Sequence, residues 1–398
     1  MREMKDSGIE WIGEIPKDWT VVAVKHCFYI NNGSDPITDE GEIPVYGSGS
    51  KSFKTCKEFK EGPTVLLGRK GTINIPQWIE SRYWNVDTSF DIKAKGNYYL
   101  KLFYYCAVCF DYERYTTQTA LPSMTQGDYK NFKIPYMNFY EQKDIVKFLD
   151  TKCSEIDATA EDIQKEISLL EEYKKSVITE AVTKGLNPDA EMKDSKIFYL
   201  GQINKTWNLT KVGYCCKKLY RPFEPSDEAL VCSNKGKVVP RGDTLIGLMS
   251  SDDNAMQGIC KGDIAIHGMD TWHGAIACSD YDGKITRVVH VCKADGDNRF
   301  VVYWLQHLAF VGVYKLISNG VRGNTSDFRS WDKVADIYVP NPIKEEQQQI
   351  ADYLDTKCSE IDTLIADKKR QLDILADYKK SLIYEYVTGK KDVPVNDF

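Results

Sequence analysis

The chain contains 398 residues and has a formal charge of -6, because Asp and Glu outnumber Lys and Arg. This length exceeds what one ordinary hydrophobic core supports, so we expect two domains with connecting structure. The negative charge excludes a protein that holds nucleic acid by overall electrostatic attraction, since phosphate contact requires a basic surface. If DNA is the ligand, the positive charge that binds it must be local or shared with partner subunits.

The sequence lacks the features of a secreted or membrane protein. No apolar stretch follows a basic start, and the longest apolar run, Val301–Ile317, is interrupted by Gln306, His307 and Lys315. A membrane-spanning helix needs about 20 consecutive apolar residues. We expect a cytoplasmic protein with no membrane partner. Its twelve scattered cysteines are predicted to be reduced thiols that act as small apolar residues.

An internal repeat organises the sequence. The segment Leu149–Asp157 is repeated identically as Leu354–Asp362, and Tyr173–Ser176 is repeated at the same offset as Tyr378–Ser381. A fixed offset indicates how many structural units a chain contains. We infer a tandem duplication.

The beginnings of the two halves match more weakly. Met4–Ser7 and Trp19 in the first half correspond to Met192–Ser195 and Trp207 in the second half, at a smaller offset. The second half therefore carries a slightly longer middle segment.

Residues 1–140 form the first predicted globular domain. Short β-branched runs such as Val65–Leu67 alternate with Gly, Pro and Asn, a pattern that favours a compact α/β module. An aromatic, helix-like stretch at Tyr98–Phe110 corresponds to Phe300–Phe310 in the second half. The two halves are therefore predicted to share a frame while their surfaces diverge.

Residues 141–187 form a predicted helical region. From Leu149 onward, apolar residues recur at alternating spacings of three and four, which makes a seam on one helical face. Asp150-Thr151 is a candidate N-cap that would separate the long helix from a short helix beginning near Glu141. A long helix of roughly 32 residues would span about 48 Å.

The second half repeats this order. Residues 188–343 form the second predicted globular domain, with apolar runs at Ile264–Ile266 and Val288–Val291 that are typical of buried strands. Residues 344–398 form the second helical region and carry the same seam.

The two helical regions most simply pack antiparallel and hold the globular domains at a fixed distance. The alternative is a pair of coiled-coil arms for dimerisation. Lys368 stands where Ile163 stands in the first copy, which weakens the seam and leaves room for an outside partner. The residues that we expect in helix or subunit packing are Leu149, Ile156, Ile163, Leu170, Val177, Leu354, Ile361, Ile365, Leu372 and Leu382.

The predicted fold class is therefore α+β. It consists of two globular α/β domains separated by two long antiparallel helices, which form a coiled-coil spacer with a pseudo-two-fold internal repeat.

The repeated helical segments and the residues around them resemble those of the specificity (S) subunits of type I restriction-modification enzymes. The resemblance is carried by Glu141-Gln142 and Glu346-Gln347 before the helices, by the repeated Tyr-Lys-Lys-Ser helix ends, and by the opening Ile15-Pro16-x-x-Trp19. The second opening, Ile203–Trp207, departs from this pattern because it lacks the proline.

The resemblance extends into the globular domains and covers almost the whole chain. In the first domain it is carried by Ile43–Gly49 and Leu67–Gly71, and in the second by Gly262–Ile264, Met269 and Asp282-Gly283.

The resemblance implies that each globular domain is a target recognition domain that reads one half of a bipartite site in double-stranded DNA. The helices would set the spacer and dock two modification subunits, which are adenine methyltransferases. Motor-nuclease subunits would join this core for restriction. The chain itself would have no catalytic residue and no cofactor, and S-adenosylmethionine, ATP and Mg would bind to the partner subunits.

Candidate DNA contacts are Arg, Lys, Asn, Gln, Ser and Thr side chains on glycine-punctuated loops, since these side chains reach base edges and phosphates. In the first domain they are Lys51, Lys54, Arg69, Lys70, Thr72, Gln118, Ser123 and Gln126. In the second domain they are Lys235, Lys237, Arg241, Arg322, Asn324 and Arg329. Taken singly, each of these lysines also fits an ordinary solvated surface charge.

Catalytic and metal motifs are weak in this sequence. Cys106-x-x-Cys109 has zinc-like spacing, but it lies in an apolar aromatic run without a second pair, which favours buried packing. The Cys and His residues between positions 260 and 278 are irregularly spaced, and no glycine-rich phosphate loop occurs. We therefore predict no metal site and no chemistry from this chain alone.

Two other functions remain open from the sequence. The chain could be a scaffold whose helices oligomerise and whose domains bind protein or sugar. It could also be a specificity domain detached from a fused methyltransferase-nuclease polypeptide. Sequence-specific binding to a split DNA site would exclude the first, and a separately encoded modification subunit would argue against the second.

Overall fold

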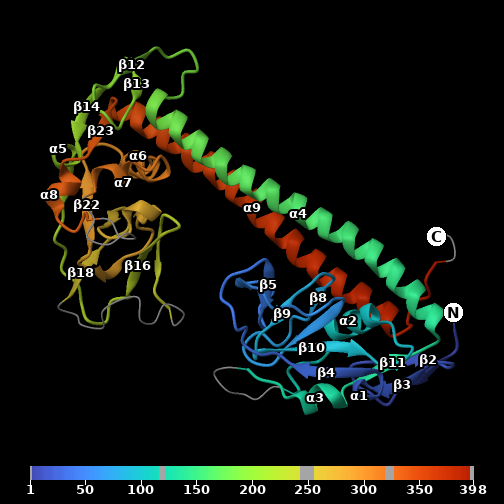
Figure 1. Cartoon of the computed structure of the whole chain (residues 1–398). Coiled ribbons are helices and arrows are strands. Elements are labelled where there is room, and N and C mark those ends of the chain that lie inside the picture. Colours follow the sequence, from blue (N-terminus) through green and yellow to red (C-terminus); the bar gives the residue numbers. More distant parts are fainter. Residues whose placement is uncertain (1, 116–121, 243–254, 319–326, 395–398) are drawn as a thin grey trace. The chain divides into compact units, whose positions relative to one another are not determined.

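The chain folds into two compact units. The computed structural model describes residues 2–115, 122–242, 255–318 and 327–394 (Figure 1). Unit 1 comprises residues 1–164 and 369–398, and unit 2 comprises residues 165–368. The division falls inside two long helices, so each unit contains one globular body and part of each helix.

The globular body of unit 1 is built on antiparallel strands. Its elements are β1 (Met4–Asp6), β2 (Glu14–Pro16), β3 (Thr20–Ala23), α1 (Val24–Cys27), β4 (Phe28–Asn32), β5 (Ile43–Tyr46), β6 (Lys54–Cys56), β7 (Thr64–Gly68), β8 (Gln77–Ile79), β9 (Trp84–Asn85), β10 (Ser89–Ala94), α2 (Leu100–Val108), α3 (Gln126–Asn131) and β11 (Lys133–Tyr136). The main sheet has the order β4-β10-β7-β8, and a smaller sheet has the order β6-β5-β9.

The core of unit 1 lies between the main sheet and α2. All five residues of β7 are buried, as expected for an inner strand whose sequence is a continuous apolar run. Helix α2 contacts β7 and β8, and its Phe103 ring lies 4.5 Å from the ring of Phe28 on β4. The strand predicted at Val65–Leu67 and the helix predicted within Tyr98–Phe110 are both confirmed.

Unit 2 repeats this order of elements. They are β12 (Met192–Asp194), β13 (Gln202–Asn204), β14 (Asn208–Lys211), α5 (Val212–Cys215), β15 (Cys216–Lys218), β16 (Leu230–Ser233), β17 (Lys237–Pro240), β18 (Met256–Ile259), β19 (Ile264–His267), η3 (Thr271–His273), β20 (Ile276–Cys278), β21 (Gly283–Thr286), β22 (Val289–Ala294), α6 (Asn298–Phe310), α7 (Val313–Ile317), α8 (Trp331–Ala335) and β23 (Tyr338–Asn341). The strands predicted at Ile264–Ile266 and Val288–Val291 are confirmed as β19 and β22.

The two globular bodies share one frame. The sheet β15-β22-β19-β20 of unit 2 corresponds to β4-β10-β7-β8 of unit 1, and the pair β14-β23 corresponds to β3-β11. The units differ in their additions: β5, β6 and β9 belong to unit 1, whereas the pairs β16-β17 and β18-β21 belong to unit 2. The predicted α+β class and internal duplication are therefore confirmed.

The long helices are α4 (Phe139–Lys184, 46 residues) and α9 (Lys344–Val387, 44 residues). The predicted break at Asp150-Thr151 is wrong, because α4 continues through it. The Thr151 hydroxyl donates to the Lys147 carbonyl one turn earlier at 3.1 Å, a bond that a helix interior accommodates. The 46-residue helix measures about 69 Å rather than the expected 48 Å.

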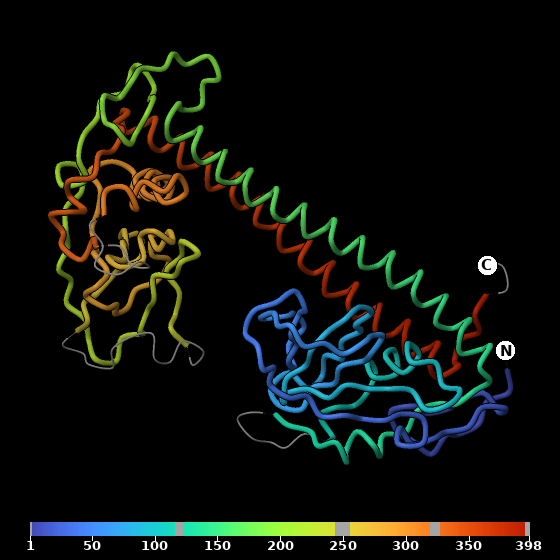
Figure 2. The backbone as a smooth tube through the Cα atoms, in the orientation of Figure 1, coloured from blue at the N-terminus to red at the C-terminus, as the bar shows by residue number. Residues whose placement is uncertain are grey.

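Within each unit, α4 and α9 lie side by side and antiparallel (Figure 2). In unit 1 the Lys379 ammonium donates to both carboxylate oxygens of Asp157 at 2.7 Å. In unit 2 Lys174 makes the same contact with Asp362 at 2.7 and 2.8 Å. The repeat relates the two lysines and the two aspartates, so these ion pairs are pseudo-two-fold mates.

The predicted seam residues are all buried or half-buried. Lys368, which interrupts the seam in sequence, contacts the Glu166 carboxylate at 2.5 Å. The replacement of an apolar residue by lysine is therefore accommodated by an ion pair between the helices.

Equivalent tyrosines attach each globular body to its helices. The Tyr105 hydroxyl on α2 donates to Asp150 on α4 at 2.6 Å. The Tyr303 hydroxyl on α6 donates to Asp355 on α9 at 2.7 Å. Asp150 and Asp355 are related by the exact repeat, so α2 and α6 occupy equivalent positions.

Candidate nucleic-acid interface

A basic turn after the buried strand β7 begins the candidate interface of unit 1. It contains Arg69, Lys70 and Thr72, all predicted to contact DNA. The Arg69 amide donates to the Thr88 carbonyl at 2.7 Å, and Gly71 has a φ of 81°, which glycine adopts without steric cost. Lys70 and Thr72 are exposed and Arg69 is half-buried. The turn therefore presents positive charge and a hydroxyl from a rigid strand.

The fold brings this turn together with the second polar segment of unit 1, residues 122–126. The Met124 amide donates to the Arg69 carbonyl at 3.0 Å, and a β-bridge pairs Lys70 with Ser123. Two segments that are distant in sequence, and that both carry predicted DNA contacts, therefore lie side by side.

Gln126 lies at the start of α3, after the capping residue Thr125. Its amide nitrogen donates to the Ile30 carbonyl at 2.6 Å, and its amide oxygen accepts from Lys130 at 2.7 Å. The side chain is thus already used within the protein, and a base contact by Gln126 would require it to exchange a partner.

The lysines between positions 51 and 60 of unit 1 have different roles in the structure. Lys51 is exposed in the connection between β5 and β6. Lys54 contacts the Asp39 carboxylate at 3.3 Å, and Lys60 contacts Asp91, whose side chain is 1% exposed. Lys60 therefore neutralises a buried carboxylate and serves the fold.

Unit 2 repeats the arrangement of turn and polar segment. The Gly268 amide after β19 donates to the Val288 carbonyl at 3.0 Å, and the Phe328 amide donates to the Gly268 carbonyl at 2.9 Å. A Cβ atom on Gly268 would lie 2.8 Å from the Phe328 carbonyl oxygen and 3.0 Å from the Arg329 Cα. Glycine therefore permits the close approach that places the exposed Arg329 beside this turn.

The other predicted cations of unit 2 lie on the β16-β17 hairpin. Lys235 and Lys237 are exposed, and Arg241 is half-buried just after the hairpin. Gly236, with a φ of 67°, forms the turn between the strands. The predicted contacts Gln118, Arg322 and Asn324 lie outside the described residues.

Unit 2 contains a basic cavity of about 610 Å³ that the sequence did not predict. Its lining includes Lys218, Tyr220, Arg221, Gln257, Arg287 and His290. The Lys218 ammonium lies 5.1 Å from the Tyr220 ring centroid and 5.8 Å from that of Trp331. The signal was present in the run from Lys217 to Arg221, where basic residues are interleaved with an aromatic one.

The basic side chains that line this cavity differ in whether a protein partner already occupies them. Arg221 forms a bidentate pair with Asp263, which is 3% exposed, and this hydrogen bond raises the pKa of Arg221. Burial lowers the pKa of His290, and its neutral ring donates from Nε2 to the Phe328 carbonyl at 2.7 Å. Lys218 and Arg287 therefore remain as the cations that a phosphate or base edge could meet.

The described residues show neither a metal centre nor a membrane span. No group of three His, Cys, Asp or Glu side chains among them could hold a metal ion. No helix in the described part of the chain is long and apolar enough to cross a bilayer.

Comparisons with known proteins agree with this geometry. Residues 16–169 match the family model described as the type I restriction modification DNA specificity domain. The type I restriction enzyme MjaVIII specificity subunit of Methanocaldococcus jannaschii is 24% identical over 94% of this chain and 93% of its own length. The putative MjaX specificity subunit of the same organism is 27% identical over 67% of this chain and 61% of its own length.

A solved structure that addresses complex assembly and conformational transition of the type I R-M system shares the fold. Its TM-score is 0.67 at 14% identity, and the match covers 95% of this chain and 99% of that chain. The chain is therefore similar to the specificity subunits of type I restriction-modification enzymes, in the segment that matches the specificity-domain model and along most of its length, and it shares the fold of the solved type I R-M structure.

Proposed function

We propose that the globular body of each unit is a target recognition domain that reads one half of a bipartite site in double-stranded DNA. The observation that carries this proposal is the repeated turn of the two units, which occupies the same place in the frame and presents different side chains. Unit 1 presents Arg69 and Lys70 on this turn, whereas the equivalent turn of unit 2 carries Gly268 and Met269 and has the exposed Arg329 of the neighbouring segment beside it. Because different side chains read different base edges, the two units would recognise different half-sites.

We further propose that α4 and α9 dock two modification subunits. Leu169 and Tyr173 on α4 are 63% and 56% exposed, and their repeat mates Ile374 and Tyr378 on α9 are 60% and 54% exposed. Residues four apart lie on one helical face, so each helix carries an exposed apolar pair at the equivalent place. Two copies of one partner would find two similar surfaces.

Partner subunits would also supply what this chain lacks. The chain has a charge of -6, so its candidate turns alone provide few phosphate contacts, and a DNA complex would gain charge neutralisation from the partners. We propose that the modification subunits bring S-adenosylmethionine for adenine methylation. Motor-nuclease subunits would bring ATP and Mg for restriction, and this chain would contribute recognition without catalysis.

A binding selection tests the recognition proposal. The chain would be purified with the modification subunit of its own system and used to select from a random duplex DNA library. We expect enrichment of a split motif, with two specific blocks separated by a fixed number of unspecified positions. Exchange of residues 1–140 for those of another specificity subunit should change one block only.

The other outcomes are informative. A change in both blocks would mean that the two domains are not independent readers. Failure to enrich any motif, with the complex intact by size-exclusion chromatography, would favour the scaffold.

A further inference from the structure

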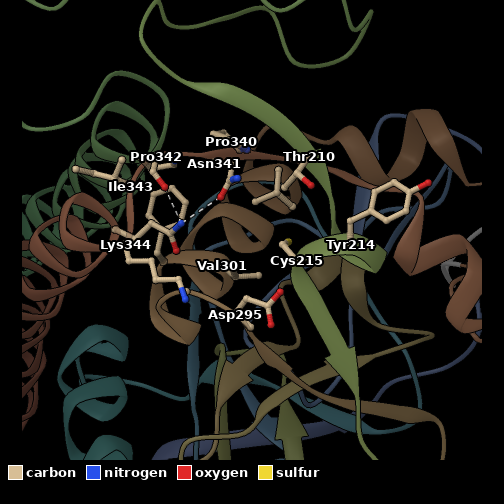
Figure 3. Close-up of a pocket in the computed structure, with 15 residues that line it drawn as sticks. Thr210, Tyr214, Cys215, Asp295, Val301, Pro340, Asn341, Pro342, Ile343 and Lys344 are labelled. Atoms are coloured by element: carbon tan, nitrogen blue, oxygen red, sulfur yellow. Dashed lines mark hydrogen bonds between the residues drawn. The ribbon is translucent and has the colours of Figure 1, made fainter.

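The basic cavity of unit 2 carries positive charge only. Lys218, Arg221 and Arg287 line it, and its described lining includes no Asp or Glu. A second cavity of this unit, of about 460 Å³ at the start of α9, carries charges of both signs on Asp295 and Lys344 (Figure 3). A cleft lined by charges of one sign concentrates ligands of the opposite sign. The basic cavity therefore favours an anion, although the whole chain has a charge of -6.

Two of these cations are held in place without being neutralised. The Lys218 ammonium lies within cation–π distance of the Tyr220 and Trp331 rings, an attraction that orients an ammonium and leaves its charge. The Arg287 Nε donates to the Met256 carbonyl at 3.0 Å, and a guanidinium has further N–H donors for a ligand. Lys218 and Arg287 therefore offer positioned donors with full positive charge.

The cavity adjoins the turn that we propose to face DNA. His290, which lines the cavity, donates to the Phe328 carbonyl at 2.7 Å, and the Phe328 amide donates to the Gly268 carbonyl of the turn at 2.9 Å. Arg329 follows directly and is exposed. An anion in the cavity would therefore lie near a residue proposed to contact DNA. In protein–DNA interfaces, backbone phosphates are the anions in this position, and their contacts fix the register of the reading residues.

Unit 1 has no lysine at the position of Lys218. Lys218 on β15 is opposite Cys292 of β22, and Ile30 on β4 is opposite Ile92 of β10 in the same register. Lys218 therefore corresponds to Ile30. Ile30 is 5% exposed, and its carbonyl accepts from the Gln126 amide at 2.6 Å. This position belongs to the core in unit 1 and to the cavity in unit 2.

The position of Arg287 is acidic in unit 1. The Thr88 and Val288 carbonyls accept from the amides of the two equivalent turns, so the residues that precede them, Asp87 and Arg287, correspond. Both are exposed. A carboxylate repels phosphate, whereas a guanidinium attracts it. The two cations of the cavity are therefore specific to unit 2.

We propose that Lys218 and Arg287 bind backbone phosphates beside the half-site that unit 2 reads, and that unit 1 makes no such contact at the equivalent positions. This inference rests on the proposed function and adds a difference between the two domains. Unit 2 holds the DNA backbone through two cations that unit 1 replaces by isoleucine and aspartate. Because phosphate contacts carry no sequence information directly, loss of either cation weakens binding without changing the motif.

Ethylation interference tests this contact on the full-length chain in complex with its modification subunit. Ethylation of a phosphate removes its charge, so it weakens binding where a cation contacts that phosphate. The motif block that stays unchanged when residues 1–140 are exchanged identifies the half-site of unit 2. We expect Lys218→Ala and Arg287→Ala each to lose interference at phosphates beside this block, with the selected motif unchanged. The slope of log affinity against log salt concentration should fall by about 1 in each variant.

Lys217→Ala is the matched control. Lys217 precedes Lys218 on β15 and is exposed, and adjacent residues of a strand face opposite sides. This variant should keep the interference pattern and the salt slope of the wild type. Circular dichroism of each chain and size-exclusion chromatography of each complex check that the variants fold and assemble.

Three results would overturn the proposal while the proposed function stands. The first is an unchanged interference pattern in Lys218→Ala or Arg287→Ala with the complex intact. The second is an altered motif in the block of unit 2, because it would show that these side chains read bases. The third comes from inorganic phosphate titrated onto the DNA-free chain and followed by NMR. Phosphate binding that is lost in Lys218→Ala, together with an unchanged interference pattern, would assign the cavity to a free anion.

Failure of the wild-type complex to enrich any split motif is a different result. It would contradict the proposed function itself and would overturn this inference with it.

Discussion

His307 makes the attachment of the second globular body to the long helices sensitive to pH. The side chain lies on α6, is 6% exposed and meets the Thr179 hydroxyl on α4 at 3.0 Å. Burial lowers its pKa from 6.5 to about 4. The folded state therefore holds the neutral ring, whereas the unfolded state binds a proton below pH 6.5. Stability from this group is complete above pH 6.5 and is lost as the pH falls towards 4.

The size of this effect follows from the difference between the two pKa values. Each unit of pKa corresponds to about 1.4 kcal/mol, and integrating proton binding from pH 7 to pH 5 gives a loss of about 2 kcal/mol in the free energy of unfolding. His307→Gln keeps a group that can bond to Thr179 but does not titrate. The variant should therefore lose about 2 kcal/mol less than the wild type over the same pH range.

Hydrogen exchange of the α6 amides, corrected for intrinsic rates at each pH, measures this difference locally. His26→Gln, at an exposed histidine of unit 1, is the matched control and should leave the pH dependence of α6 unchanged. The reasoning is refuted if the wild type and His307→Gln lose the same stability between pH 7 and pH 5.

Three further predictions concern the interface and the helices. Lys70→Ala should weaken DNA binding by the assembled complex and reduce the slope of log affinity against log salt concentration by about 1. Lys93→Ala is the control and should change neither quantity, because Lys93 lies on β10, five residues from the residue that bonds to the turn. Equal slopes for Lys70→Ala and the wild type in salt titrations would show that Lys70 does not contact phosphate. Trp207→Phe should lower the free energy of unfolding in urea by about 1 kcal/mol more than Trp19→Phe does. The reason is that the Trp207 indole donates to Glu346 at 3.1 Å, whereas the Trp19 indole has no partner among the described residues. Equal losses of unfolding free energy in the two variants would contradict this prediction. Insertion of one heptad into both helices at the division between the units adds about 10.5 Å to each helix. The spacer between the two DNA half-sites should then lengthen by about three base pairs. An unchanged spacer in a binding selection would refute the proposal that the helices set its length.

The duplication made much of the fold predictable from the sequence. An identical segment such as Leu149–Asp157 has the same local preference in both copies, so the same apolar spacing predicted both long helices, and both are observed. The boundary of the helix was less predictable, because Thr151 can either cap a helix or bond back to the preceding turn. The tertiary contact of Asp150 with Tyr105, which is compatible with the second choice, leaves no local trace in the sequence.

The candidate interface was predictable only in part. Glycine and basic residues predicted the turn at Arg69. Its contact with the segment of Ser123 was not predicted, because it depends on a β-bridge between segments that are distant in sequence.

Single-molecule mapping of methylated adenines tests the central claim most directly. Cells that carry this gene with the gene for its modification subunit would be compared with cells that lack this gene alone. We predict a split methylation motif with two fixed blocks that disappears completely when this gene is deleted. A motif that persists without the gene would contradict the claim that this chain supplies the sequence recognition.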